Sequence, residues 1–81
     1  MPESRVFDLI VEHVREVIPE LEDHRFEPSD SLRDLGANSI DRAEVIIMTL
    51  ESLSVRIPLV ELADAKNIGE LADLIHDKSA V

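Results

Sequence analysis

Apolar residues return every three or four positions in three segments of the chain, and this helical spacing limits the fold more than any other feature. The first segment covers residues 5–18, between Ser4, a good N-cap residue, and Pro19, which discourages continuation. The second covers roughly 40–53, and the third begins after Asn67. The residues expected to face the core are Val6, Leu9, Ile10, Val14 and Val17 in the first, Ala43, Ile46, Leu50 and Leu53 in the second, and Ile68, Leu71, Leu74 and Ile75 in the third.

Two shorter signals complete the expected helical architecture. Asn67 and Glu70 resemble a capping box at the start of the last helix. Pro58 suits the first turn of a short third helix, about 59–64, because its missing N–H would have no intrahelical partner there. Only two glycines and no tyrosine or tryptophan disfavour a β-sandwich or barrel. The sequence therefore predicts an all-α, four-helix bundle, three main helices plus a short third helix, as a single domain of residues 1–81.

A long segment without periodicity, residues 19–38, separates the first two helices. Phe26, Leu32 and Leu35 are the side chains expected to hold this loop against the core. Loops of this length are uncommon in small domains and are more often functional than decorative. The string "GANSID", which begins at Gly36 where the loop meets the second helix, is therefore the candidate site.

The charge of the chain limits its partners. Eighteen acidic against eight basic residues leave a net charge of -10, which repels nucleic acids and anionic lipids and attracts basic surfaces on other proteins. No cysteine is present, which excludes a disulfide scaffold and a thiolate metal site. The start of the sequence lacks the pattern of a signal peptide, and no apolar stretch approaches a membrane span. We expect a cytoplasmic monomer that binds neither nucleic acid nor membranes.

The string "DLGANSID", from Asp34 to Asp41, resembles the phosphopantetheine attachment site of acyl carrier proteins. In that family a glycine stands three residues before the modified serine and an apolar residue follows it, as Gly36 and Ile40 do here around Ser39. Asn38, where the family often has Asp, and Ile40, where it often has Leu, are mild departures. The order of helices and the long loop also match the acyl-carrier type of bundle along the whole chain.

This resemblance implies a carrier and not an enzyme. A phosphopantetheinyl transferase would attach 4'-phosphopantetheine from coenzyme A to Ser39, and the terminal thiol of this arm would hold an acyl group as a thioester. The residues agree, because a serine at a helix start presents its hydroxyl beyond the end of the bundle, where backbone N–H groups and the helix dipole favour a phosphodiester. Taken by its position alone, Ser39 would be an ordinary N-cap.

The second helix carries another stripe at spacings of four, three and four: Ile40, Glu44, Ile47 and Glu51. By resemblance this helix recognises partner enzymes, whose basic residues meet its acids. A solvated face with two stray isoleucines is the plainer interpretation. Ketosynthases and acyltransferases with basic docking surfaces are candidate partners. The expected partner-binding residues are Ile40, Asp41, Arg42, Glu44, Ile47 and Glu51.

The string "NSIDRAEV", from Asn38 to Val45, resembles the freestanding carriers that polyketide clusters use to install β-branches. That subfamily shares Arg42, and the resemblance implies an acetyl donor for a hydroxymethylglutaryl-synthase-like enzyme. A general fatty-acid or polyketide carrier, and a peptidyl carrier, stay open as alternatives. So does an acidic helical adaptor without a prosthetic group.

Other chemistries find little support in the sequence. A hydrolase would need a histidine placed to activate Ser39, and the spacing of His13, His24 and His76 indicates no such arrangement. No metal site is expected, because an EF-hand alignment would put Leu32 where an oxygen ligand is required. In the short third helix, Leu59 and Val60 are interpreted as core residues, with an acyl-binding cleft as the alternative.

Overall fold

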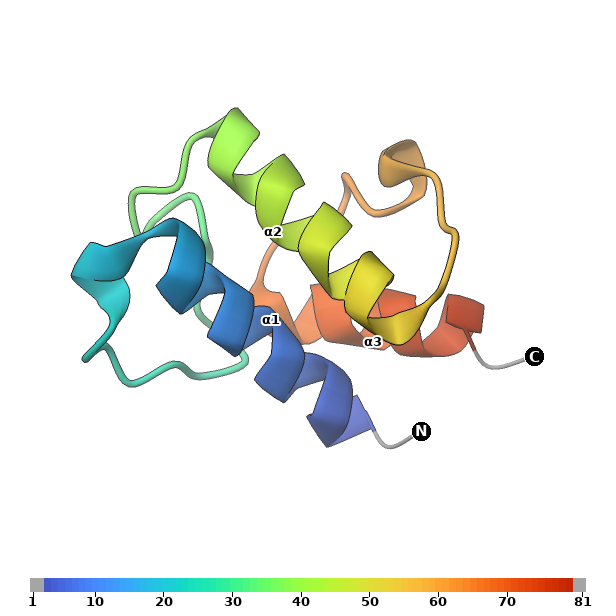
Figure 1. Cartoon of the computed structure of the whole chain (residues 1–81), viewed down its shortest axis with the longest axis horizontal. Helices are drawn as coiled ribbons and strands as arrows, with labels where there is room; N and C mark the ends of the chain where they lie inside the picture. Colours follow the sequence, from blue (N-terminus) through green and yellow to red (C-terminus); the bar gives the residue numbers. More distant parts are fainter. Residues whose placement is uncertain (1–2, 80–81) are drawn as a thin grey trace.

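The computed structural model describes residues 3–79, and within them it contains three α-helices and no strand. These are α1 (Glu3–Val17), α2 (Ser39–Leu53) and α3 (Ile68–Ser79), and two 3-10 turns, η1 (Pro19–Leu21) and η2 (Leu59–Glu61), lie between them. Helix α1 packs against both α2 and α3. Figure 1 shows the start of α2 at the opposite end of the molecule from the start of α1 and the end of α3. In residues 3–79 no helix is long and apolar enough to cross a membrane.

Helix α1 buries the predicted apolar stripe with two changes. Val6, Ile10 and Val14 are completely buried, whereas Val17 is only half-buried and Val11 is buried as well. Ser4 is not the N-cap, because the helix already includes Glu3.

Helix α2 is turned differently from the sequence prediction. Leu50 is buried as expected, but Val45 and Thr49 are the completely buried residues, and Ile46 is only partly covered. The Thr49 hydroxyl donates to the Val45 carbonyl at 2.8 Å, so its polar atom is satisfied inside the core. The predicted face is therefore only partly right. Leu50 is buried and Ile46 and Leu53 pack against the core, whereas Ala43 borders an open cleft.

Helix α3 starts as predicted, since Asn67 Oδ1 accepts a hydrogen bond from the Glu70 N–H at 2.7 Å. Its buried residues are Ile68, Leu71, Ala72 and Ile75, while Leu74 is partly buried.

The first turn of α3 also anchors the long loop. The Gly69 N–H donates to the Pro28 carbonyl at 2.8 Å, and the Ile68 N–H donates to the Asp30 carbonyl at 2.9 Å. A Cβ atom at position 69 would lie 2.9 Å from the Pro28 Cβ, so the close approach of loop and helix requires glycine.

Inside the loop, Leu32 is buried as predicted, Phe26 packs partly against the core, and Leu35 is half-buried. The Arg15 guanidinium lies 5.3 Å from the centre of the Phe26 ring. The pKa of Asp30 lies below its ordinary value, because the Glu27 N–H donates to its carboxylate and the His24 ring hydrogen-bonds to it. These contacts order the loop without regular structure.

The predicted helix at 59–64 is wrong, because only the 3-10 turn η2 (Leu59–Glu61) forms after Pro58. The turn itself buries no residue, and the anchor is Leu62, which directly follows it and is 1% exposed. The core interpretation of Leu59 and Val60 is therefore also wrong, since they are 38% and 77% exposed.

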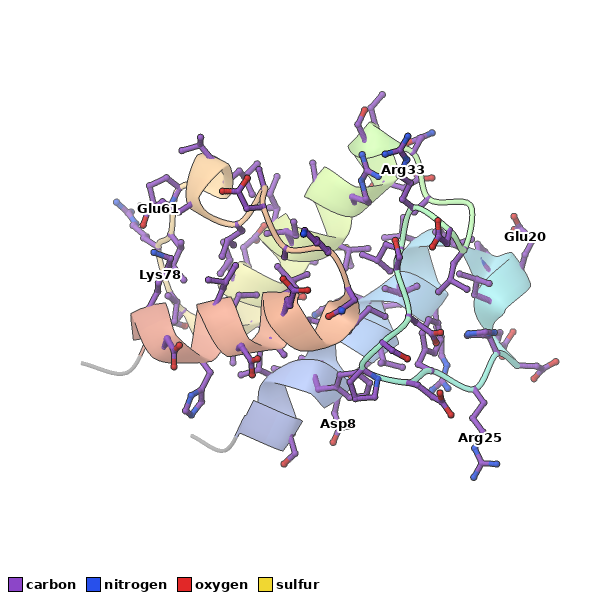
Figure 2. The ribbon with its side chains drawn as sticks, turned by 180° about the vertical axis from the view of Figure 1, so that it is seen from behind. Asp8, Glu20, Arg25, Arg33, Glu61 and Lys78 are labelled. Carbon is purple, nitrogen blue, oxygen red and sulfur yellow. The ribbon has the colours of Figure 1, made fainter. Side chains whose placement is uncertain are left out.

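An ion pair fastens η2 to the last helix. The Lys78 Nζ lies 2.8 Å from Glu61 Oε1, and Figure 2 shows the two side chains together.

Candidate functional site

The residue that caps α2 is Asn38 and not Ser39. Asn38 has an extended backbone, and its Oδ1 accepts a hydrogen bond from the Asp41 N–H at 2.8 Å. Ser39 is the first helical residue, so the interpretation of Ser39 as an ordinary N-cap is wrong. Because the neighbouring amide does the capping, the Ser39 hydroxyl is left for other chemistry.

Gly36 directs the loop into this helix. Its φ of +100° lies in the left-handed region that side chains disfavour, and no atom lies within 4 Å of the position that a Cβ would take there, so conformation and not space calls for glycine. The next residue, Ala37, is buried, and its N–H donates to the Leu32 carbonyl at 2.9 Å. The chain thus turns sharply and immediately begins α2.

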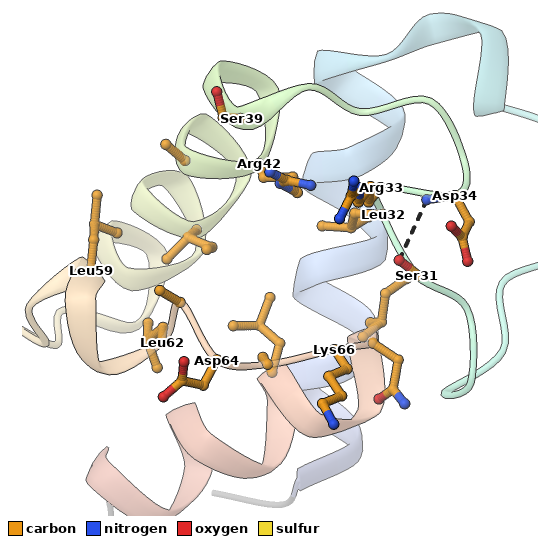
Figure 3. Close-up of a pocket in the computed structure, with 17 residues that line it drawn as sticks. Ser31, Leu32, Arg33, Asp34, Ser39, Arg42, Leu59, Leu62, Asp64 and Lys66 are labelled. Carbon is orange, nitrogen blue, oxygen red and sulfur yellow. Dashed lines mark hydrogen bonds between the residues drawn. The ribbon is translucent and has the colours of Figure 1, made fainter.

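Ser39 is exposed, and its hydroxyl makes no hydrogen bond within residues 3–79. Figure 3 shows this hydroxyl pointing outward from the first turn of α2. The N–H groups of Ser39 and Ile40 precede the first helical hydrogen bond, which runs from Arg42 N to the Asn38 carbonyl. An accessible hydroxyl beside unpaired amide donors fits a covalently attached phosphate group.

On one side of Ser39 lies a shallow groove along α2, which we name the α2 groove. The apolar side chains in it are exposed to an unusual degree: Ile40 is 74% and Ile47 is 43% exposed. The structure thus brings together four of the six predicted partner-binding residues. The groove is lined by Ser39, Ile40, Ala43, Glu44, Ile47, Met48 and Glu51.

On another side Ser39 borders a larger cleft of about 730 Å³, which we name the inner cleft. Its walls come from the end of the long loop, α2, η2 and the segment that leads into α3 (Figure 3). Apolar residues such as Ile46 and Leu62 lie in it, together with charged residues. Leu59 also lines it, in agreement with the alternative interpretation of that residue.

The two remaining predicted partner residues lie apart from the stripe. Arg42 is half-buried and lines the inner cleft, whereas Asp41 lines neither hollow. The sequence analysis also missed two further cations of the inner cleft, Arg33 and Lys66. Nothing in their local pattern marks them, because they lie in segments that meet only in the folded chain.

The histidines are engaged elsewhere. His13 hydrogen-bonds to Ser52 Oγ at 3.0 Å, and His24 hydrogen-bonds to Asp30 at 3.1 Å. No hydrogen bond joins a histidine to Ser39 within residues 3–79, so the described chain holds no Ser–His pair at this serine. The same residues contain no group of three His, Asp or Glu side chains arranged to hold a metal ion.

A three-helix bundle with an exposed serine at the start of α2 is the arrangement expected of a protein that carries a prosthetic group on that serine. The family model described as the phosphopantetheine attachment site matches residues 8–75 of this chain. The chain therefore belongs to the phosphopantetheine-bearing acyl carriers, whose prosthetic group is linked covalently through a serine and which are not themselves enzymes.

Two similar proteins give a finer comparison. The polyketide biosynthesis acyl-carrier protein AcpK of Bacillus subtilis (strain 168) is 54% identical over 78 residues, which are 96% of this chain and 95% of the relative. The second similar protein is a chain in the crystal structure of the curacin biosynthetic pathway HMG synthase in complex with an acetyl-donor ACP, and it is also 54% identical to this chain. That match has a TM-score of 0.92 and covers 96% of this chain and 100% of that one, so the matched chain is of carrier size.

Proposed function

We propose that this chain is the acetyl-donor carrier of a polyketide β-branching system and that Ser39 bears its phosphopantetheine arm. The observation that carries the proposal is the similarity, over almost the full length of both chains, to a chain solved in an HMG synthase–acetyl-donor complex. The polyketide carrier of similar identity supports the same pathway class.

Loading requires a reachable nucleophile, and Ser39 supplies one. With a phosphopantetheinyl transferase, Ser39 Oγ forms a bond to the pantetheine-bearing phosphorus of coenzyme A, the pyrophosphate bond breaks, adenosine bisphosphate leaves, and the hydroxyl proton passes to a base of the transferase. The positive end of the α2 dipole and the first N–H groups of the helix then lie beside the new phosphodiester. The arm, once attached, supplies the thiol that this cysteine-free chain lacks.

The α2 groove supplies the docking surface in this proposal. Exposed Ile40 and Ile47 offer apolar contact beside the arm, and Glu44 and Glu51 offer charges to a basic partner. Asp41 in the first turn adds a further acid. Arg42, on the side of the inner cleft, alters the charge pattern that a partner must complement.

Charge reversal by Glu44→Lys should slow arm transfer by a phosphopantetheinyl transferase by on the order of tenfold at low salt, because exposed charges steer encounter. The difference should shrink as salt rises, since the Debye length is about 8 Å at physiological ionic strength. Glu12→Lys on α1 is the matched control, as Glu12 is exposed but lines neither hollow. Equal rates for the wild-type and Glu44→Lys chains at all salt concentrations would exclude the groove from docking.

The acetyl-donor role is tested by loading the carrier with acetyl-phosphopantetheine. The loaded carrier is offered to a branching synthase with an acetoacetyl-loaded acceptor carrier, and mass spectrometry follows both carriers. We expect consumption of the acetyl group, and weaker consumption by Arg42→Thr than by the exposed control Arg56→Thr. If the synthase ignores the carrier while a fatty-acid ketosynthase elongates from it efficiently, the chain is a general carrier.

A further inference from the structure

Several basic residues of this acidic chain share one hollow. Three of its eight Lys and Arg residues, Arg33, Arg42 and Lys66, line the inner cleft. None of these three side chains forms a hydrogen bond or an ion pair within residues 3–79. Elsewhere Lys78 is paired with Glu61 and Arg15 donates to the His24 carbonyl, whereas Arg5, Arg25 and Arg56 form no such contact within residues 3–79 either. The cations of the inner cleft therefore have no ion-pair partner in the described part of the chain.

Two of these cations face each other. Figure 3 shows the Arg33 and Arg42 side chains pointing toward one another, beside Leu32, whereas Lys66 lies across the cleft and points away from them. Asp34 and Asp64 also line the cleft, but neither carboxylate lies within ion-pair distance of an arginine in residues 3–79. Like charges repel, so an anion bound between these two guanidinium groups would lower their electrostatic energy.

The covalent arm brings such an anion to the same cleft. Ser39 and Arg42 both line it and stand three residues apart on α2, so their side chains are neighbours on the helix surface. A phosphodiester on Ser39 Oγ would start within reach of Arg42, and its tether would give it a high effective concentration. Guanidinium groups bind phosphate oxygens in a bidentate manner, which an ammonium group does not.

We propose that Arg33 and Arg42 form a binding site for the phosphodiester of the arm, which directs the arm into the inner cleft instead of toward open solvent. This proposal rests on the proposed attachment at Ser39. In this proposal Arg33, which lies in the loop and outside the α2 groove, positions the arm. The cleft volume of about 730 Å³ leaves room beyond the phosphate for the arm and a short acyl group.

The test compares the apo and holo forms of the whole chain by NMR. Intact mass first establishes that the arm is on the wild-type chain and absent from Ser39→Ala. Between the apo and holo forms, the side-chain Nε–Hε signals of both Arg33 and Arg42 should then shift. The ³¹P signal of the holo form should differ from that of a phosphopantetheinylated peptide of residues 36–42. Arg33→Gln should abolish the shift at Arg42 and return the ³¹P signal to the peptide value. Lys66→Gln, a neutralised cation of the same cleft, should leave both shifts in place.

The outcomes separate the two proposals. An arm found on another residue overturns the attachment proposal. An arm on Ser39 with unchanged arginine signals, or with equal effects of Arg33→Gln and Lys66→Gln, overturns only the phosphate site. If the arginine signals shift only when the acyl group ends in a carboxylate, Arg33 and Arg42 bind the acyl group and not the phosphodiester, and the proposed phosphate site is also overturned.

Discussion

Replacing Ser39 with alanine should abolish loading of the arm completely and leave the fold almost unchanged. Alanine has no hydroxyl to form the phosphodiester, so the expected product of incubation with coenzyme A and a broad phosphopantetheinyl transferase is unmodified protein. Because Ser39 is exposed and does not cap α2, the free energy of unfolding should change by only about 0.5 kcal/mol. Intact-mass spectrometry and denaturant unfolding measure the two effects.

Asn38→Ala is the matched control at the adjacent position. It removes the side chain that accepts from the Asp41 N–H, and losing such a cap costs about 0.5–2 kcal/mol. The Asn38→Ala protein should therefore be less stable than Ser39→Ala but should still accept the arm. Any mass gain in Ser39→Ala would contradict the assignment, because another serine would then be the nucleophile.

Leu62→Ala should destabilise the whole domain by about 2–5 kcal/mol, a large part of the stability expected for so small a protein. Leu62 is 1% exposed, joins the hydrophobic cluster beneath η2, and lines the inner cleft. Its truncation removes apolar contacts and leaves a cavity where η2 is attached. Urea unfolding followed by circular dichroism gives the change in the free energy of unfolding.

Val60→Ala is the control for this substitution. Val60 lies two residues earlier, in η2, and is 77% exposed, so its truncation should change stability by no more than about 0.5 kcal/mol. Similar effects of the two substitutions would show that Leu62 does not anchor η2. In that case the wall of the inner cleft would depend on other contacts, such as the Lys78–Glu61 ion pair.

The position of Ser39 is compatible with access by partner enzymes. The serine lies on the first turn of a helix whose Val45, Thr49 and Leu50 are buried in the core, while the loop before it is tied to α3 by the Gly69 and Ile68 amides. Under the proposed attachment, the arm would start from an exposed position on a regular helix. Partner specificity can then change through exposed residues of α2, such as Glu44, without any change in the core.

The sequence by itself determined the features that depend on near neighbours along the chain. Helical spacing located α1, α2 and α3 to within a few residues, because a repeat of about 3.6 residues is a local property. The Asn67 cap and the exposure of Ile40 and Ile47 followed from the same kind of pattern. The turn at Gly36, three residues before the serine, is likewise made by consecutive residues and was readable from the sequence.

Only the tertiary structure decided which faces are covered and which distant residues meet. Val45 and Thr49 proved to be the most deeply buried residues of α2, and the predicted Ala43 borders the inner cleft, while α2 packs against α1. Periodicity shows that a helix has an apolar face, but not which part of that face each neighbouring element covers. Likewise, Arg33 and Arg42 come from a loop and a helix whose mutual placement depends on the packing of the whole core, so no local pattern could place them together.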